Sequence, residues 1–115
     1  MKKEILIGYK KKKIKVLVRN CNLFEKAIGL MFSNKEKAEI LLFDFDKKQS
    51  IKIHSFFVFY DFLAVWLDEK NKIVDLKKVS PFCFCVSPKK ACFKLVEIPI
   101  NSKNKKILSK FSFKN

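Results

Sequence analysis

The feature that most constrains the fold of this chain is a central stretch, Ile51 to Leu76, in which aromatic and β-branched residues are interrupted at short intervals by polar ones. Its longest apolar run, Ile53 to Leu67, contains His54 and Asp61 and is shorter than the roughly 20 residues of a membrane helix. Aromatic and β-branched residues favour strands. The stretch therefore predicts buried strands, broken at Tyr60-Asp61, and no membrane span.

The rest of the chain has the same character. Alternating patterns and short apolar runs predict strands in residues 5–9, 14–19, 39–45, 50–59, 62–68, 72–77, 82–86, 92–98 and 107–113. Polar turns separate them, among them a charged hairpin turn at Lys10 to Lys13. One short α-helix is predicted near residues 22–30, because Asn22 and Glu25 have capping-box spacing and Gly29 suits a helix end. The predicted fold is mainly β: a small single-domain β-barrel or sandwich over residues 1–115.

The charge of the chain has two interpretations. Its 115 residues carry 26 basic and 11 acidic side chains, a formal net charge of +15. A basic surface of this strength is typical of proteins that bind a polyanion such as RNA. However, Arg19 is the only arginine, and nucleic-acid readers favour arginine for bidentate contacts. A solvated lysine surface is therefore the preferred interpretation, and the polyanion partner stays open as the alternative.

No targeting segment is recognised in the sequence. The apolar run Ile5-Leu6-Ile7 near the start is too short for a signal peptide. We therefore expect a cytoplasmic protein. In that compartment the four cysteines would be reduced thiols.

Three residues are candidates for acid/base chemistry. Histidine is the only residue type that ordinarily titrates near neutrality, and His54 is the only histidine. A regular strand over residues 50–59 would place it on one face with Lys52, Phe56 and Val58. Paired with Asp61 or Glu97, it could serve as the acid/base of a hydrolase. No Gly-rich elbow, phosphate loop or His-Glu zinc pattern accompanies these residues, so a packed structural histidine is the alternative.

The cysteines raise the question of a metal site. Cys83 and Cys85 are two residues apart and would share one face of a strand. A tight turn over Ser87–Lys90 would set Cys85 opposite Cys92, and Cys21 or His54 could complete a zinc site. The Cys-x-Cys spacing is not that of common zinc ribbons, and free cysteines often behave as small core residues. Cys83, Cys85 and Cys92 are therefore metal candidates, while no cofactor is predicted.

Two further groups of side chains have both a structural and a functional interpretation. Asp44 and Asp46 share a face of a predicted strand and could hold a cation, although Lys47 and Lys48 beside them indicate a solvated turn. A run of aromatic residues could form a stacking platform for single-stranded RNA, although core packing explains their density better. These residues are Phe56, Phe57, Phe59, Tyr60, Phe62 and Trp66.

Three groups of segments, taken in order, carry a family resemblance. They are Gly29-Leu30-Met31; then Ile53–Phe59 with Val65–Asp68 and Lys72–Val74; and finally Pro81, Pro88–Ala91 and Glu97–Pro99. Together they resemble the domain-of-unknown-function 192 family in its archaeal form. The resemblance implies a small, mainly β fold and no established chemistry. Where the family's central motif usually carries Pro and Asp, this chain has Asp61 and Leu63.

The sequence leaves three functions open. The preferred hypothesis is a small non-enzymatic binding or interaction module, because no local catalytic pattern accompanies the candidate residues. The first alternative is a β domain that binds RNA or another polyanion. The second is a hydrolase with His54 as acid/base.

Overall fold

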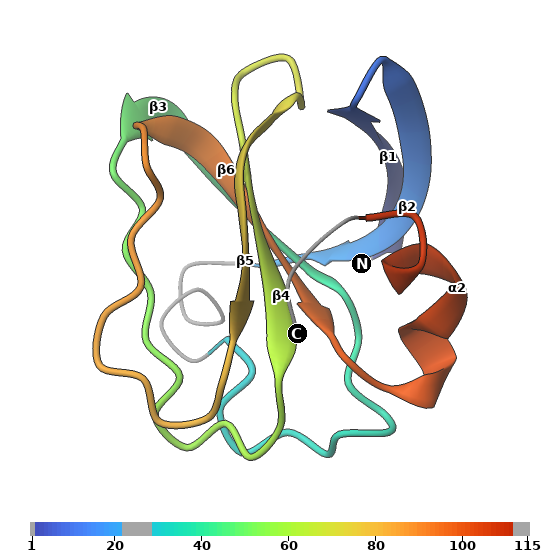
Figure 1. Ribbon diagram of the computed structural model, residues 1–115, viewed down its shortest axis with the longest axis vertical. Coiled ribbons are helices and arrows are strands. Elements are labelled where there is room, and N and C mark those ends of the chain that lie inside the picture. Colours follow the sequence, from blue (N-terminus) through green and yellow to red (C-terminus); the bar gives the residue numbers. More distant parts are fainter. Residues whose placement is uncertain (1, 22–28, 112–115) are drawn as a thin grey trace.

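Six strands form one curled sheet in the computed structural model, which describes residues 2–21 and 29–111 (Figure 1). The strands are β1 (Lys2–Tyr9), β2 (Lys12–Asn20), β3 (Leu41–Gln49), β4 (Phe62–Leu67), β5 (Ile73–Val79) and β6 (Cys92–Pro99), in the spatial order β1-β2-β3-β6-β4-β5. A 3-10 turn, η1 (Ser102–Asn104), leads into the short helix α2 (Lys105–Leu108). The predicted mainly β fold is confirmed.

The sheet curls far enough for its first strand to reach the turn between its last two paired strands. The backbone N–H of Gly8 donates to the carbonyl oxygen of Asn71 over 2.8 Å. A Cβ at Gly8 would lie 3.2 Å from Cγ of Lys72, so a side chain there would crowd this contact. The six strands therefore form a half-barrel that touches itself at one end.

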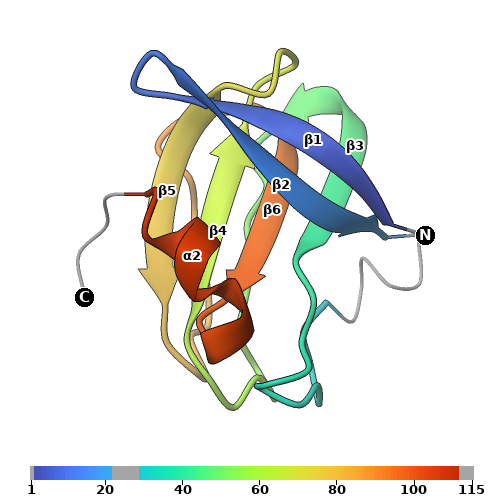
Figure 2. The same cartoon turned by 90° about the vertical axis from the view of Figure 1, so that its right-hand side faces the viewer.

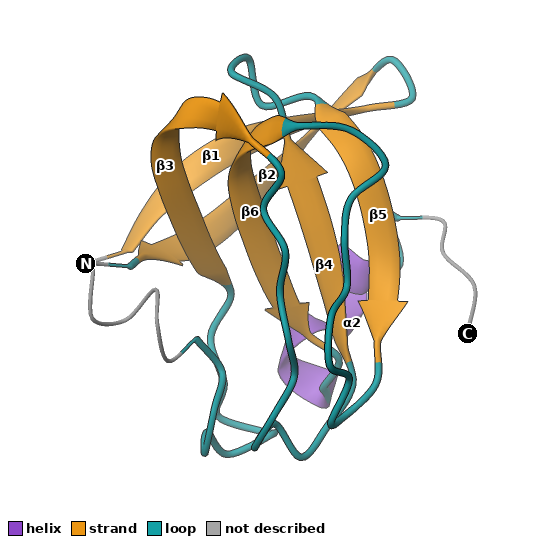
Figure 3. Ribbon diagram, turned by 90° about the vertical axis from the view of Figure 1, so that its left-hand side faces the viewer, coloured by secondary structure: helices purple, strands orange, loops and turns teal. Residues whose placement is uncertain are grey.

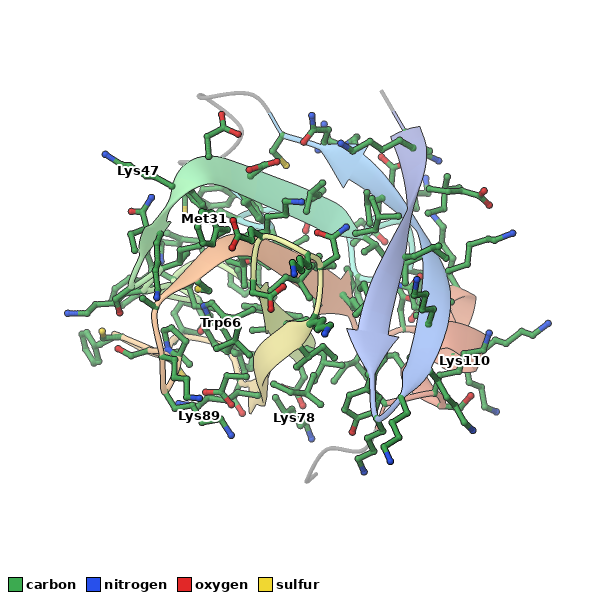
Figure 4. The ribbon with its side chains drawn as sticks, turned by 90° about the horizontal axis from the view of Figure 1, so that it is seen from above. Met31, Lys47, Trp66, Lys78, Lys89 and Lys110 are labelled. Atoms are coloured by element: carbon green, nitrogen blue, oxygen red, sulfur yellow. The ribbon has the colours of Figure 1, made fainter. Side chains whose placement is uncertain are left out.

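β4 lies between β6 and β5 in the sheet and is buried on both faces. Leu63, Val65 and Leu67 point into the curl, where strands β1 and β2 and helix α2 cover them (Figure 2). Phe62 and Trp66 point to the other face, and Figure 4 shows Trp66 inside the molecule. Since successive side chains of a strand point to opposite faces, the continuous apolar sequence of β4 fits a strand between two cores.

Two long loops, residues 50–61 and 80–91, cover the outer face of the half-barrel (Figure 3). Ile53 and Val86 exchange two backbone hydrogen bonds of 3.0 and 2.8 Å, which join the loops to each other. The indole N–H of Trp66 donates to the carbonyl oxygen of Ile51 over 2.8 Å and ties the first loop to β4. The second core therefore lies between the sheet and two loops.

Ser55 joins these loops where they are most deeply buried. Its side chain is fully buried, donates to the carbonyl oxygen of Ser80 over 2.6 Å, and accepts from the backbone N–H of Cys83 over 2.7 Å. Its backbone N–H donates to the carbonyl oxygen of Cys83, and its carbonyl accepts from Phe82. One residue thus makes four hydrogen bonds to the 80–83 segment.

Three predicted strands are wrong. Residues 50–59 and 82–86 form no strand, and their one β-bridge is Ile53–Val86, because Ser55 engages backbone groups that a regular ladder would pair. The first residues of the predicted strand 107–113 belong to α2 instead. The Asn101 side chain accepts from the N–H of Asn104 over 2.9 Å and caps the 3-10 turn that leads into this helix. Residues 112–113 lie outside the described residues.

The predicted helix near residues 22–30 falls mainly on residues 22–28, which lie outside the described residues. Gly29 and Leu30 are described and lie in turns, and Gly29 has a φ of +57°. The predicted hairpin turn of lysines is confirmed: β1 and β2 pair in antiparallel fashion from Lys2↔Arg19 to Tyr9↔Lys12, so that Lys10 and Lys11 form the turn.

Replacing Ser55 with alanine tests the junction of the loops. The change leaves the partly buried N–H of Cys83 without its acceptor, so we expect the free energy of unfolding to fall by about 1–3 kcal/mol. Urea unfolding followed by the fluorescence of Trp66 measures the loss. Ser80→Ala is the matched control, because the exposed Ser80 contributes its backbone carbonyl to the junction. Equal stability of the two variants would contradict this role for Ser55.

Candidate functional site

A pocket of about 110 Å³ opens on the loop-covered side of the half-barrel. Its walls come from three parts of the chain that lie far apart in sequence: the segment before β3, the first long loop, and strands β3, β4 and β6. Most of the lining is apolar. The lining residues are Gly29, Leu30, Met31, Phe43, Phe45, Ile51, Lys52, Ile53, His54, Val58, Phe62, Leu95 and Glu97.

Glu97 is the buried polar residue of this pocket. It lies on β6, between Leu41 of β3 and Ala64 of β4 in the register, and is 6% exposed. Burial raises the pKa of Glu97 to about 8, because the low-dielectric surroundings disfavour the charged form. The carboxyl group is therefore mostly protonated at neutral pH and can donate a hydrogen bond into the pocket.

Gly29 lies close to the carboxyl group of Glu97, and the absence of a side chain at this position leaves space for the carboxyl group. A Cβ at Gly29 would lie 3.4 Å from Oε1 of Glu97, and its φ of +57° favours glycine. Tyr60 lies nearby, and its hydroxyl is hydrogen-bonded to that of Ser33. Burial raises the pKa of Tyr60, the Ser33 hydrogen bond opposes the rise, and the charge of Glu97 adds to it.

His54 and Lys52 line the same pocket and are exposed, so they belong to its mouth. Nδ1 of His54 accepts from the backbone N–H of Phe56 over 3.2 Å, and the two rings lie 5.2 Å apart. The structure thus brings two of the three catalytic candidates, His54 and Glu97, to one cavity. The predicted strand face of His54 is wrong, because the segment is a loop in which Val58 is buried while Lys52 and His54 are exposed.

Asp61 is not among the residues that line the pocket. Its carboxylate lies 3.3 Å from Nζ of Lys78 on a partly exposed surface. Its carbonyl oxygen accepts from the N–H of Ile100 over 3.0 Å. The ion pair joins the start of β4 to β5, and the backbone bond joins it to the chain just after β6, so the role that they support for Asp61 is structural.

Exposed phenylalanines gather on the loops beside the pocket mouth. We call this set the phenylalanine patch; it comprises Phe32, Phe57, Phe59, Phe82 and Phe84, whose exposed fractions range from 48% to 82%. The rings of Phe32 and Phe57 stack with centroids 5.0 Å apart, and Phe82 meets Phe59 edge-on at 5.5 Å. Phe84 meets Phe56, which packs on His54. The patch and the pocket mouth are therefore continuous.

Three members of the phenylalanine patch adopt a left-handed backbone. The φ angles of Phe32, Phe57 and Phe82 are 61°, 60° and 60°. This conformation costs a non-glycine residue about 1–2 kcal/mol. The N–H of Phe32 donates to the carbonyl of Phe57, and that of Phe82 to the carbonyl of Ser55. Strain of this kind concentrates at functional sites.

The preferred interpretation of the aromatic run, core packing, is right for half of its residues. Tyr60, Phe62 and Trp66 are buried and belong to the outer core, whereas Phe57 and Phe59 are exposed. Phe32, Phe82 and Phe84 lie outside the aromatic run that the sequence predicts. No spacing in the sequence distinguishes them, because they reach the patch from different loops.

The other predicted site residues lie apart from the pocket. Cys85 is exposed, while Cys92 is buried and its thiol donates to the carbonyl of Gln49; burial raises the pKa of Cys92. The predicted hairpin that set Cys85 opposite Cys92 is wrong, because Val86 pairs with Ile53 instead. In residues 2–21 and 29–111, no three His, Cys, Asp or Glu side chains are grouped to hold a metal ion.

The two aspartates of β3 form a turn. Oδ1 of Asp44 accepts from the N–H of Asp46 over 3.1 Å, and Asp46 has a φ of +57°. The register of β3 against β6 shifts between Asp44 and Gln49. The contact between Asp44 and Asp46 thus lies where the pairing of β3 with β6 becomes irregular.

No described helix is long and apolar enough to cross a membrane.

Comparison with known proteins places the chain in a family. No family model matches it. Over 79 residues, which are 69% of this chain and 67% of the relative, it is 30% identical to a UPF0127 protein of Pyrococcus abyssi. The chain belongs to the UPF0127 family.

Two solved structures share the fold of this UPF0127 chain. One is a candidate transcription regulator from Sinorhizobium meliloti, with a TM-score of 0.73 and 13% identity over 92% of this chain and 84% of that one. The other is a protein of unknown function from Novosphingobium aromaticivorans, with a TM-score of 0.73 and 11% identity over 92% and 78% of the two chains. Identities this low show the fold alone.

Replacing Glu97 with glutamine tests the burial of its carboxyl group. The folded protein retains the proton of Glu97 up to about pH 8, whereas an unfolded glutamate loses it near its ordinary pKa of 4.5. The stability that this proton contributes is therefore complete below pH 4.5 and is lost as the pH rises towards 8. We expect Glu97→Gln to be more stable than the parent at pH 8, by roughly 1–4 kcal/mol.

Urea unfolding of both proteins between pH 5 and pH 9 measures this difference. Glu36→Gln is the matched control, because Glu36 lies at the surface and the Ser102 hydroxyl hydrogen bond lowers its pKa. A parent and a Glu97→Gln variant whose stabilities change in parallel with pH would contradict a buried, protonated Glu97.

Proposed function

We propose that this UPF0127 protein is a binding module and not an enzyme, and that the pocket above Glu97 is its binding site. The observation that carries the proposal is a carboxyl group that is almost wholly buried and lines a cavity. Burying a polar group costs free energy unless it is hydrogen-bonded, and a ligand in the cavity would be within reach of this one.

The chemistry of the walls indicates the class of ligand. Apolar side chains such as Phe43, Phe62 and Leu95 suit a hydrocarbon body. The protonated carboxyl group of Glu97 suits a hydrogen-bond acceptor, and Lys52 at the mouth favours a negative charge. A cavity of about 110 Å³ admits only a small group. We therefore propose a short-chain carboxylate, or a larger molecule that inserts such a group, as the ligand.

The family resemblance supports the same site. Gly29, Leu30 and Met31 of the first resembling segment, Ile53 and His54 of the second, and Glu97 of the third all line this pocket. Residues that lie far apart in the chain thus meet around one cavity. We accordingly propose that the chain is also a member of the domain-of-unknown-function 192 family. We further propose a cytoplasmic location, in which the four free thiols would stay reduced.

A second candidate function is a hydrolase with His54 as acid/base, because His54 and Glu97 share the pocket. The nearest buried hydroxyl on that loop, Ser55, is already engaged as both donor and acceptor, which argues against it as a nucleophile. Turnover of ester substrates that His54→Ala abolishes would favour the hydrolase over the binding module.

Titration with butyrate, followed by amide signals in NMR spectra, tests the binding proposal. We expect the signals of Gly29 to Met31 and of Ile53 and His54 to shift at pH 6.5. The affinity should fall as the pH rises through about 8, because ionised Glu97 repels a carboxylate. Lys52 and His54 also line this site. Burial raises the pKa of Tyr60, which lies near Glu97, so the tyrosine stays neutral through this pH range.

Glu97→Gln is the informative variant, because an amide keeps a hydrogen-bond donor and cannot ionise. It should bind butyrate with little change between pH 7 and pH 9. Glu39→Gln, a change in a surface ion pair with Lys2, should keep the pH dependence of the parent. The proposal fails if butyrate shifts no pocket signals, or if its affinity stays constant through pH 8 in the parent protein.

A further inference from the structure

The acidic residues of this chain are unevenly distributed. None occurs between Glu4 and Glu25, and none follows Glu97. Within those two segments, the described residues 5–21 and 98–111 carry ten basic side chains and no acidic one. A uniform lysine enrichment would not by itself produce two segments free of acids.

The fold brings these two segments together. Helix α2 packs against the β1–β2 hairpin, with Leu108 and Phe111 in the same core cluster as Ile7 and Ile14 (Figure 2). The rings of Tyr9 and Phe111 lie 5.6 Å apart. Most of the excess positive charge is therefore gathered on one side of the half-barrel.

A groove of about 550 Å³ lies where the hairpin and the end of α2 meet. Four of its seven lining residues are lysines and none is acidic; the lining comprises Tyr9, Lys10, Lys12, Lys13, Ile14, Ser109 and Lys110. Asp75 lines an adjoining hollow with Lys10. Its carboxylate already accepts from the N–H groups of Leu76 and Lys89 and lies 3.8 Å from Nζ of Lys77.

The hairpin turn beside the groove consists of two residues with a left-handed backbone. Lys10 and Lys11 occupy the two central positions of the hairpin turn, with φ angles of 47° and 65°. A two-residue turn of this kind favours Asn-Gly, because left-handed backbone costs other residues about 1–2 kcal/mol each. Two lysines at these positions place positive charge beside the groove, although their left-handed backbone costs conformational free energy.

We propose that this groove, the lysine groove, binds a chain of phosphate groups, and that its natural ligand is the backbone of a single-stranded nucleic acid. Lysines provide point charges that attract phosphates without reading bases, so binding should be independent of sequence. The ring of Tyr9 lies at the same groove, with Nζ of Lys10 5.2 Å from its centroid.

The lysine groove is separate from the pocket above Glu97. The lysine groove is formed by β1, β2 and the segment that follows α2, none of which lines that pocket. The phenylalanine patch also lies on other segments, in the loops around residues 32, 57 and 82. Each proposal can therefore fail while the other stands.

Binding of a short fluorescein-labelled oligouridylate at increasing salt concentration tests the proposal. Comparing Lys12→Gln/Lys13→Gln with Lys47→Gln/Lys48→Gln separates a defined site from diffuse charge, because both pairs are exposed neighbours and lower the net charge equally. Figure 4 shows Lys47 and Lys110 on opposite sides of the molecule, so the control pair lies far from the groove.

We expect the parent to bind the probe at low salt. The logarithm of the affinity should fall linearly with that of the salt concentration, by about 0.7 per phosphate contact. The groove pair should lower this slope by about 1 to 2 and weaken binding at every salt concentration. The control pair should leave both close to the parent. Circular dichroism establishes that the variants fold.

Two results would overturn the proposal: no binding of oligouridylate at low salt, or equal losses in the groove and control pairs. Competition with inorganic polyphosphate distinguishes the two sources of phosphate. If oligouridylate competes better at equal phosphate concentration, the nucleic-acid strand is the ligand. If polyphosphate competes equally well or better, the groove binds phosphate chains in general and the assignment to nucleic acid is wrong.

Discussion

The four hydrogen bonds of Ser55 to the 80–83 segment are the constraint on which the candidate binding site depends. They join two loops that have little regular structure of their own and hold them over the outer face of the sheet. They hold together the two segments in which Phe57 and Phe82 adopt a left-handed backbone. Because Ser55 is fully buried, each of these groups must be satisfied within the protein. A buried polar residue thus organises an exposed apolar surface.

The same face of the sheet explains why a carboxyl group can be buried at Glu97. On β6, Leu95 and Glu97 point to the outer face, whereas Val96 and Ile98 point into the curl. Loops can leave a small cavity over the outer face, whereas the inner face is closed by β1, β2 and α2. A glutamate on the inner face would be surrounded by well-packed aliphatic side chains. Its position opposite the loops makes it available to a ligand.

Strands with one buried face could be predicted from the sequence, because alternation in Ile14, Val16 and Val18 directly reflects burial. The run Phe62–Leu67 was equally clear. The strand predicted over residues 50–59 is wrong. Aromatic and β-branched side chains favour strands, but here they belong to a loop and cover a core. No pattern of spacing could show that His54 and Glu97 meet, since only the tertiary fold brings them together. The family-like segments were the one sequence signal for that cavity.

The half-barrel gives the chain two chemically opposite surfaces, and its topology keeps them apart. The long loops that carry all of the phenylalanine patch except Phe32 connect β3 to β4 and β5 to β6, and they cover the outer face (Figure 3). The acid-free segments form the hairpin and the chain after β6, so they lie across the inner face. An apolar ligand and a phosphate chain would thus approach different elements. The lysine groove and the pocket above Glu97 share no lining residue, so a ligand in one would not occupy the other.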